Sequence, residues 1–201
     1  PGWFDFYDIY NLFVSKMLPG ESFCEVGSFM GKSLAYLLER ASLLNKRIKV
    51  YSVDRFVITR DTEPGQEEQD GGMPWEENAR AWEKRNPPDV LFNAFSSNIS
   101  RVLGYELVEG VSQGNSVDIA PNFKDESLAV VFIDAGHTYK MIYADLVAWF
   151  PKVKYGGIIA GHDWLGESVR KAVIDFFPKE CPIRFSNNTW MVMKGERNWF
   201  Q

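Results

Sequence analysis

Cysteine and histidine are scarce in this 201-residue sequence, with two of each, and the 22 basic residues are fewer than the 27 acidic ones. Its two cysteines, Cys24 and Cys181, do not make a disulfide framework. The formal charge of −5 leaves no basic stripe for a duplex, so we expect no nucleic-acid partner. No apolar run reaches the roughly 18 residues of a membrane span, and no signal peptide is recognisable. These absences favour a cytoplasmic enzyme or binding domain.

Two apolar patterns alternate along the chain. Short runs of apolar residues predict strands, and apolar residues spaced three and four apart predict helices. The strongest run, Leu128–Ile133, is apolar throughout, as in a strand covered on both faces. We therefore expect one α/β domain over residues 1–201, with a doubly wound, mostly parallel, seven-stranded Rossmann-like sheet and an antiparallel last strand. The predicted strands are 22–26, 48–53, 105–111, 128–133, 156–161, 183–185 and 189–193.

One long segment interrupts this alternation. Residues 60–80 include seven acidic and two basic residues, with several glycines and prolines and no periodicity. A loop of this length inside a compact domain is either a functional lid or a disordered insertion. Trp75 favours the lid, because a fully solvated loop gains little from an indole. We expect an acidic lid-like insertion at about 59–80, covering an acceptor other than a polyanion.

Two glycines follow the first predicted strand and precede a helix, as in a nucleotide-binding βαβ unit. Gly31-Lys32-Ser33 looks like the end of a P-loop. However, three residues rather than four separate Gly31 from Gly27, which shortens the loop that must surround a phosphate. A dinucleotide site is also weakly supported. It requires glycine at position 25, where Glu25 would repel a pyrophosphate.

S-adenosylmethionine (SAM) is the third candidate ligand, because it carries no phosphate. Glu25 can face the cationic end of SAM, Gly27 lets the backbone approach it, and Gly31 allows the helix to pack closely on the strand. Asp54, at the end of the second predicted strand, can accept hydrogen bonds from both ribose hydroxyls. This combination favours SAM. The predicted cofactor contacts in this half are Glu25, Gly27, Ser28, Gly31, Asp54 and Arg55.

Both histidines of the sequence follow predicted strands. Asp134 and His137 follow the fourth strand, and His162 and Asp163 follow the fifth. If these strands are neighbours, their ends lie roughly 5 Å apart. Asp134, His162 and Asp163 can then share one divalent ion, and this oxygen-rich set suits Mg²⁺ or Mn²⁺. Alternatively, each aspartate caps the next helix and each histidine is an ordinary surface or hydrogen-bonded residue. The convergence of four polar residues favours the site.

The second half of the chain resembles a known family. The stretches FIDAGHTY (132–139), WFPKVK (149–154) and GGIIAGHD (156–163), with Asp145, resemble the class I SAM-dependent methyltransferases of the macrocin O-methyltransferase-like group. The resemblance extends from Phe23 to about Lys194. It includes Gly114-Asn115-Ser116 and Ala172-Val173. The first glycine turn is shared by all class I methyltransferases, whereas the two blocks at 134–139 and 156–163 are more specific.

This resemblance implies O-methylation of a hydroxyl, often on a sugar or another small natural product, with Mg²⁺ in several relatives. In the first half, Glu25, Gly27 and Asp54 match the family's cofactor positions. Asn115 and Ser116 match the edge of the adenine site.

The resemblance also assigns the polar residues of the second half. Asp134, His162 and Asp163 match metal positions, and Asp134 is additionally a predicted cofactor contact. Relatives commonly carry two acidic or amide residues at the last pair, a pattern from which His162 departs. Catechol-type methyltransferases have a lysine base three residues after the strand-four aspartate, and His137 stands at that offset.

Our hypothesis from the sequence is a SAM-dependent O-methyltransferase. His137 would remove the proton of a metal-bound hydroxyl, with Asp134 as the second catalytic residue. The alternative is a SAM- or nucleotide-binding module without methyl transfer, in which the histidines are structural. We expect a small-molecule acceptor, no nucleic acid and no membrane. The aromatic N-terminal helix, with Trp3, Phe4 and Phe6, is also a candidate surface for packing on a second copy of the chain.

Overall fold

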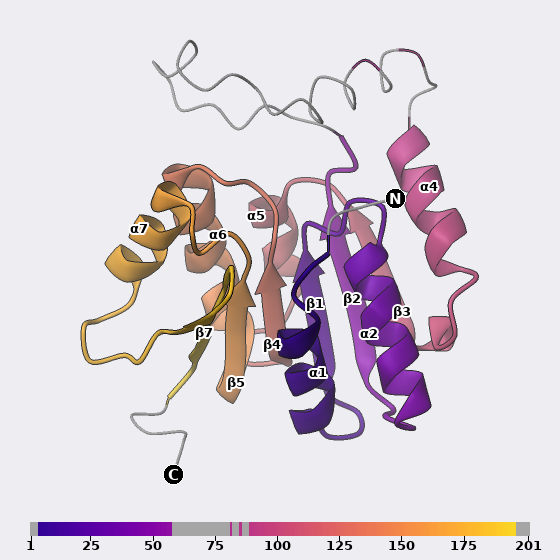
Figure 1. Ribbon diagram of the computed structural model, residues 1–201, viewed down its shortest axis with the longest axis horizontal. Helices are drawn as coiled ribbons and strands as arrows, with labels where there is room; N and C mark the ends of the chain where they lie inside the picture. The colour runs from indigo at the N-terminus through magenta and orange to yellow at the C-terminus, as the bar shows by residue number, and fades with distance from the viewer. Residues whose placement is uncertain (1–3, 58–80, 82–84, 86–88, 196–201) are drawn as a thin grey trace.

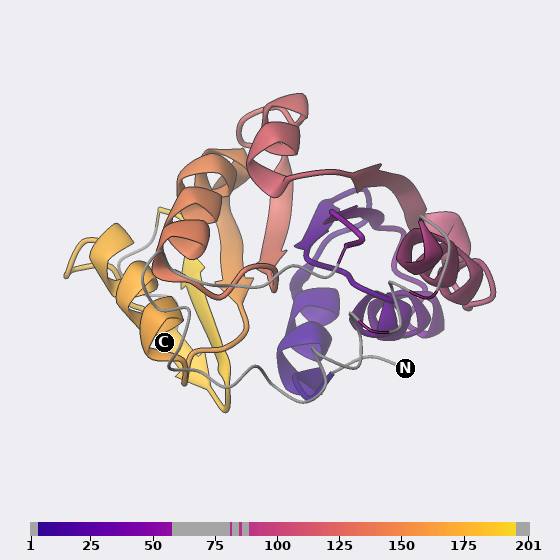
Figure 2. The same cartoon turned by 90° about the horizontal axis from the view of Figure 1, so that it is seen from above.

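The computed structural model describes residues 4–57, 81, 85 and 89–195. Within them, seven strands form one sheet with helices on both faces (Figures 1 and 2). The strands are β1 (Ser22–Val26), β2 (Lys49–Asp54), β3 (Val108–Gln113), β4 (Leu128–Ile133), β5 (Val153–Gly161), β6 (Arg184–Ser186) and β7 (Thr189–Met193). The α-helices are α1 (Tyr7–Lys16), α2 (Lys32–Leu43), α4 (Val90–Ile99), α5 (Ser116–Ile119), α6 (Tyr139–Trp149) and α7 (Glu167–Phe176).

The strand order is β3-β2-β1-β4-β5-β7-β6. Strands β1 to β5 pair in parallel, whereas β7 runs antiparallel to both β5 and β6. This arrangement confirms the predicted α/β sheet: doubly wound, mostly parallel, and Rossmann-like with an antiparallel last strand. The carboxyl ends of β1, β2, β4 and β5 consequently meet at one edge of the sheet, where an open α/β fold binds its ligands.

Two hydrophobic layers cover the sheet because successive strand residues point to opposite faces. In β4, Val130 and Phe132 pack in the layer of α1, α2 and α4, and Val131 and Ile133 pack in the layer of α5, α6 and α7. Figure 2 shows these two helix layers on either side of the strands. Every residue of β4 is buried, as its uninterrupted apolar run predicts.

The predicted strand at 105–111 was wrong at both ends. Residues Tyr105–Leu107 form a 3₁₀ turn after Gly104, and β3 runs on to Gln113. As an edge strand, β3 alternates half-buried with exposed residues, which weakens its apolar signal. Strand β5 begins at Val153, three residues before its predicted start, because the register with β4 is irregular there and Gly156 has a positive φ.

Two further expectations concern the surroundings of the sheet. The predicted acidic lid at 59–80 lies outside the described residues. None of the described helices combines the length and the hydropathy that crossing a lipid bilayer requires.

Candidate active site

The turn after β1 lies in close contact with the ends of the neighbouring strands β2 and β4. Gly27 donates its N–H to the Val53 carbonyl at 2.8 Å. Its φ is +94°, and a Cβ on this residue would lie 2.1 Å from the carbonyl oxygen of Asp134. Only glycine fits this position, because both the backbone angle and the close approach exclude a side chain. The turn is therefore in direct contact with the end of β4.

Glu25, the last acidic residue before this turn, is fully buried. Its Oε1 accepts hydrogen bonds from the Tyr10 hydroxyl at 2.5 Å and the Ser33 hydroxyl at 2.6 Å. Among the described residues, Oε2 has no hydrogen-bond partner. Burial raises the pKa of Glu25 to about 7, although the bonds from Ser33 and Tyr10 oppose this rise. An unsatisfied carboxylate oxygen of this kind fits the ammonium group of SAM.

Asp54 ends β2 and holds the backbone around it. Its Oδ2 accepts the Phe29 N–H at 2.7 Å, and its Oδ1 accepts the Phe56 N–H at 2.6 Å. Burial raises the pKa of Asp54, and these N–H groups oppose the rise. Each carboxylate oxygen has a second lone pair. The oriented carboxylate can therefore also accept the two ribose hydroxyls of SAM.

Three other predicted contacts surround this turn. Ser28 is buried and accepts a hydrogen bond from the Ser52 hydroxyl at 2.8 Å. Gly31 precedes α2 with a φ of +80°, and a Cβ there would lie 2.8 Å from the side chain of Ile99 in α4. The expected role of Gly31 was close packing of the helix on the strand, whereas the close contact found here is with helix α4. Arg55 is exposed beside Asp54.

The two residues predicted at the adenine edge lie at the start of α5. Asn115 is exposed and precedes the helix. Ser116 donates its hydroxyl hydrogen bond to Asp145 of α6. Burial raises the pKa of Asp145 to about 6, and the Ser116 bond opposes the rise. The hydrogen bond between Ser116 and Asp145 therefore joins α5 to α6. In the sequence, the two residues were connected only because both belong to the family resemblance.

A second polar cluster forms where β4 and β5 end. Ile133 pairs with Gly161, so Asp134 and His162 emerge side by side. One ligand atom from each of Asp134, His162 and Asp163 lies within 4.8 Å of the others. The Nδ1 atom of His162 is 3.7 Å from Asp134 Oδ1 and 3.3 Å from Asp163 Oδ1. The structure therefore brings the three predicted metal residues together.

His137 joins this cluster through Asp163. Its Nε2 lies 2.9 Å from Asp163 Oδ2, and the side chain is about half exposed. Burial alone would raise the pKa of Asp163, but hydrogen bonds from His137 and His162 outweigh it and hold the pKa below its usual range. Burial likewise opposes the charge on His162, yet the bond to Asp163 and the neighbouring carboxylates raise its pKa. Asp163 itself has a φ of +59°, a strained conformation for a side-chain-bearing residue.

The capping alternative for the two aspartates does not hold. Helix α6 is capped by Thr138, whose hydroxyl accepts the Met141 N–H at 3.3 Å. Helix α7 follows Gly166 and has no side-chain cap. Asp134 and Asp163 instead face His162. Burial also raises the pKa of Asp134 to about 6, and the charge of His162 opposes the rise.

These residues fit a divalent cation. Ligand atoms on one Mg²⁺ at about 2.1 Å lie about 3 to 4 Å apart, close to the separations seen here. Two carboxylates dominate the donor set, and the imidazole widens the range of metals that it would accept. A cation would also offset the cost of crowding two carboxylates at a partly buried edge.

Comparison with known proteins agrees with this architecture. Residues 24–164, which contain the first turn and both strand ends with their polar residues, match a family model described as a methyltransferase domain. The chain belongs to this methyltransferase family. Its sheet order and turn are those of a class I SAM-dependent methyltransferase. No curated protein matches the sequence at a significant level.

Several solved structures share the fold of this methyltransferase. The O-methyltransferase NovP is 19% identical with a TM-score of 0.66, over 94% of this chain and 79% of NovP. CalS11, a TDP-rhamnose 3′-O-methyltransferase, is 14% identical with a TM-score of 0.55, over 94% of this chain and 77% of CalS11. An rRNA methylase from Streptococcus thermophilus is 13% identical with a TM-score of 0.55, over 96% and 99% of the two chains.

Sequence reasoning missed three residues that complete the polar cluster of this methyltransferase. Asp5 Oδ1 lies 3.0 Å from His162 Nε2, and the Asn188 amide donates to Asp163 Oδ1 at 3.2 Å. The Phe6 ring is 4.8 Å from the His162 ring. Asp5 and Phe6 precede α1, and Asn188 lies in the β6–β7 turn. No sequence signal connects these positions with a site, so only the packing of α1 and the β6–β7 hairpin on the sheet reveals them.

The aromatic residues before α1 have a different role from the one expected. Phe4 and Phe6 are buried in this chain, where Phe4 packs on Tyr10 and Tyr36, and Phe6 packs on Phe132. They therefore do not provide an exposed surface for a second copy. Trp3 lies outside the described residues.

Proposed function

We propose that this methyltransferase transfers the methyl group of SAM to a hydroxyl oxygen of a small molecule. The observation that carries the proposal is the position of Asp134. Its backbone contacts Gly27 in the predicted cofactor turn, and its carboxylate faces His162 in the polar cluster. A methyl donor held at the turn and an acceptor held at the cluster would meet at this residue, as transfer requires.

Glu25 and Asp54 are the residues that we assign to the cofactor. The unpartnered Oε2 of Glu25 would accept the ammonium group, and the Asp54 carboxylate would orient the ribose. Ser116, placed by Asp145, would border the adenine. SAM supplies the activated methyl group on a positively charged sulfur.

The His137–Asp163 pair is suited to accept the proton of the hydroxyl. With His137 Nε2–H donating to Asp163, the ring's Nδ1 is the position at which the pair would take up a proton. The new O–C bond forms as the S–C bond breaks, and the electron pair of that bond stays on sulfur. The products are the methyl ether, S-adenosylhomocysteine and protonated His137.

Asp134, His162 and Asp163 would hold the divalent ion, as the resemblance to metal-dependent relatives implies. Bound there, Mg²⁺ or Mn²⁺ would lower the pKa of the acceptor hydroxyl. His162 departs from the carboxylate or amide usual in relatives, which favours Mn²⁺ because imidazole is a softer ligand than oxygen.

NovP and CalS11 are both named as O-methyltransferases, which supports oxygen as the acceptor atom. They also agree with the macrocin-like group suggested by residues 132–139 and 156–163. The net charge of −5 supports a small acceptor in preference to a nucleic acid.

Binding and turnover test this function separately. S-adenosylhomocysteine should raise the melting temperature where ATP and NAD do not, since neither phosphate ligand suits Glu25. Absence of that shift at millimolar concentration would remove the cofactor assignment. A binding module without methyl transfer would show the shift but release no S-adenosylhomocysteine from SAM with any hydroxyl acceptor.

A further inference from the structure

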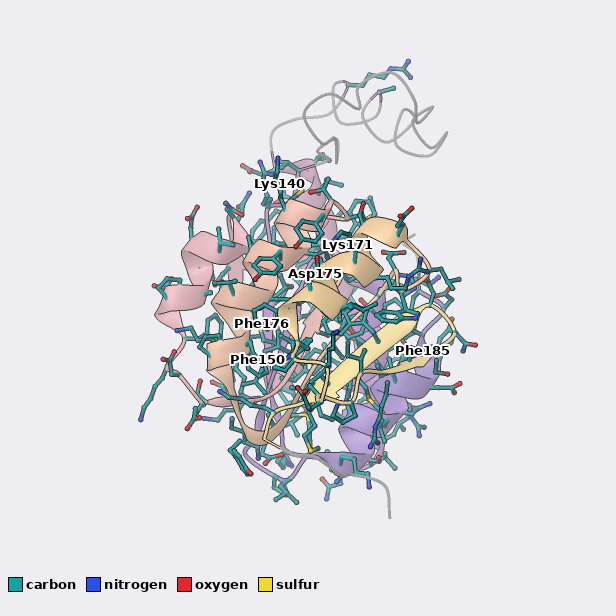
Figure 3. All side chains as sticks on the ribbon, turned by 90° about the vertical axis from the view of Figure 1, so that its left-hand side faces the viewer. Lys140, Phe150, Lys171, Asp175, Phe176 and Phe185 are labelled. Carbon is teal, nitrogen blue, oxygen red and sulfur yellow. The ribbon has the colours of Figure 1, made fainter. Side chains whose placement is uncertain are left out.

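A cavity of about 170 Å³ lies between α1 and the β6–β7 hairpin. Apolar side chains from both elements form most of its wall: Phe6, Ile9, Leu12, Phe185, Trp190 and Met191. Phe6, Ile9 and Trp190 are themselves buried, and Phe185 lies exposed on the hairpin, where Figure 3 labels it. The cavity is therefore built into the packing of α1 on the end of the sheet.

One end of this cavity lies beside the polar cluster of the candidate active site, although Asp134, His162 and Asp163 do not themselves line it. Asp5 and Asn188 line the cavity, and they contact His162 at 3.0 Å and Asp163 at 3.2 Å. Phe6 also lines it, with its ring 4.8 Å from that of His162. A molecule in the cavity can therefore place one polar group beside the residues that would hold the acceptor hydroxyl.

The far end of the cavity lies along the hairpin. Ser186 pairs with Thr189 near the cluster, and Arg184 pairs with Met191 two residues further along. Two residues of extended strand span about 7 Å. This length suits one six-membered ring with a substituent, and a cavity of about 150 Å³ is known to hold a benzene molecule.

The chemistry of the wall selects among hydroxyl compounds of this size. A monosaccharide carries a hydroxyl on almost every carbon, and each would need a hydrogen-bond partner when buried. Most of the wall area is apolar and comes from residues such as Phe6, Ile9, Trp190 and Met191, although Asp8, Arg184, Ser186 and Thr189 also line the cavity. A phenolic ring buries its apolar faces there and keeps its hydroxyl at the polar end.

We propose that this cavity is the acceptor pocket and that it takes a single-ring phenol, with the reacting hydroxyl between Asp5 and Asn188. This inference rests on the proposed transfer to oxygen. It departs from the sugar acceptor that the resemblance alone suggests. The phenolic O–H gives its proton to His137, and the oxygen takes the methyl group from sulfur.

Filling the cavity tests the assignment. Leu12→Trp extends an indole from α1 into the space, and Met191→Phe fills it from the hairpin, so that one variant remains if the other fails to fold. Leu43→Trp is the matched control, because Leu43 is an exposed helical leucine outside the cavity. The assay measures S-adenosylhomocysteine released from SAM with a panel of monocyclic phenols and a panel of monosaccharides, with Mn²⁺ present.

We expect the wild type to methylate phenols with a kcat/KM at least about tenfold above that for monosaccharides. Both filling variants should lose about tenfold or more of the phenol kcat/KM, mainly through KM, while S-adenosylhomocysteine binding and the Leu43→Trp activity stay unchanged. Methylation of monosaccharides alone, no methylation of any phenol, or full activity in both filling variants would overturn this inference. Failure of the wild type to bind S-adenosylhomocysteine would instead overturn the proposed function.

Discussion

Acidic side chains end four neighbouring strands of this sheet, but the two halves of the edge stabilise them differently. In the β1–β2 half, Glu25 accepts hydrogen bonds from two hydroxyls and Asp54 from two backbone N–H groups. In the β4–β5 half, Asp134 and Asp163 face the imidazoles of His162 and His137. The hydrogen-bond donors to Glu25 and Asp54 are neutral, whereas the imidazoles that face Asp134 and Asp163 can carry a positive charge.

The pKa values of Glu25 and Asp163 follow this difference. Burial raises the pKa of Glu25 to about 7, because hydroxyl donors only partly oppose it. The pKa of Asp163 falls despite burial, because two histidines outweigh the desolvation. In the first half, burial also raises the pKa of Asp54, although its backbone hydrogen bonds and the charge of Arg55 oppose the rise. In the second half, the two histidines keep Asp163 charged, whereas burial raises the pKa of Asp134 to about 6.

The largest effect is expected where the two halves touch. Gly27→Ala would place a Cβ 2.1 Å from the Asp134 carbonyl, so the turn and the end of β4 must separate. We expect a loss of about 3 kcal/mol or more in unfolding free energy, together with loss of S-adenosylhomocysteine binding. Urea unfolding and calorimetric titration measure the two losses.

Gly20→Ala is the matched control for this steric effect. Gly20 has a similar φ of +85°, but a Cβ on this residue would have no other atom within 4 Å. The variant should lose only about 1 kcal/mol, the cost of a left-handed conformation for alanine. Equal losses in the two variants would show that the contact with Asp134 is unimportant.

A second prediction concerns the charge of Glu25. Its folded pKa of about 7 lies above the usual 4.5, so the wild type is fully stabilised below about pH 4.5 and loses stability as pH rises through about 7. Glu25→Gln does not titrate. The unfolding free energy of the variant minus that of the wild type should therefore rise by about 3 kcal/mol between about pH 4 and about pH 8. Denaturant titrations across this range check the sign; a flat difference would place Glu25 in a better-solvated environment.

The third prediction addresses the metal in the β4–β5 half. At a tenfold excess over its Kd, Mn²⁺ should raise the unfolding free energy by about 1.4 kcal/mol. Asp134→Asn should remove this gain, and chelation should reverse it in the wild type. Asp125→Asn is the control, because Asp125 is an exposed carboxylate paired with Lys152. A persistent gain in the Asp134 variant would exclude the assigned ligand set.

The smallest effect on stability is expected at His137, whose contact with Asp163 is partly exposed. His137→Gln should change the unfolding free energy by less than about 1 kcal/mol. Its kcat should nevertheless fall about 10²-fold or more, because the proton acceptor is lost, with S-adenosylhomocysteine binding unchanged. Single-turnover methyl transfer measures the chemical step.

An exposed ion pair on α7 provides the comparison for that variant. Lys171 and Asp175 are 2.5 Å apart and are labelled in Figure 3. Asp175→Asn should cost a similarly small amount of stability and leave kcat unchanged. A normal kcat in His137→Gln would assign the proton transfer to another group.

Much of the fold was predictable because strands and helices leave characteristic spacings of apolar residues in the sequence. The apolar run of β4 is buried at every residue, and the helix expected after the two glycines begins at Lys32, directly after Gly31. Edge strand β3 was placed poorly, since half of its residues are exposed and its pattern is weak. Glu25, Asp54, Asp134 and Asp163 were identifiable for the same reason: each stands where a strong apolar run stops.

The sequence by itself therefore determined the order of the strands along the chain, the glycine turn and the acidic residues at the strand ends, because each depends on near neighbours. Only the tertiary structure decided which side chains contact the residues at the strand ends. Tyr10 reaches Glu25 across 15 residues, Asp5 reaches His162 across 157, and Asn188 reaches Asp163 across 25. Such contacts depend on how α1 and the β6–β7 hairpin pack on the sheet, and the same packing encloses the cavity beside the polar cluster. Contacts between distant segments leave no periodic trace in a single sequence.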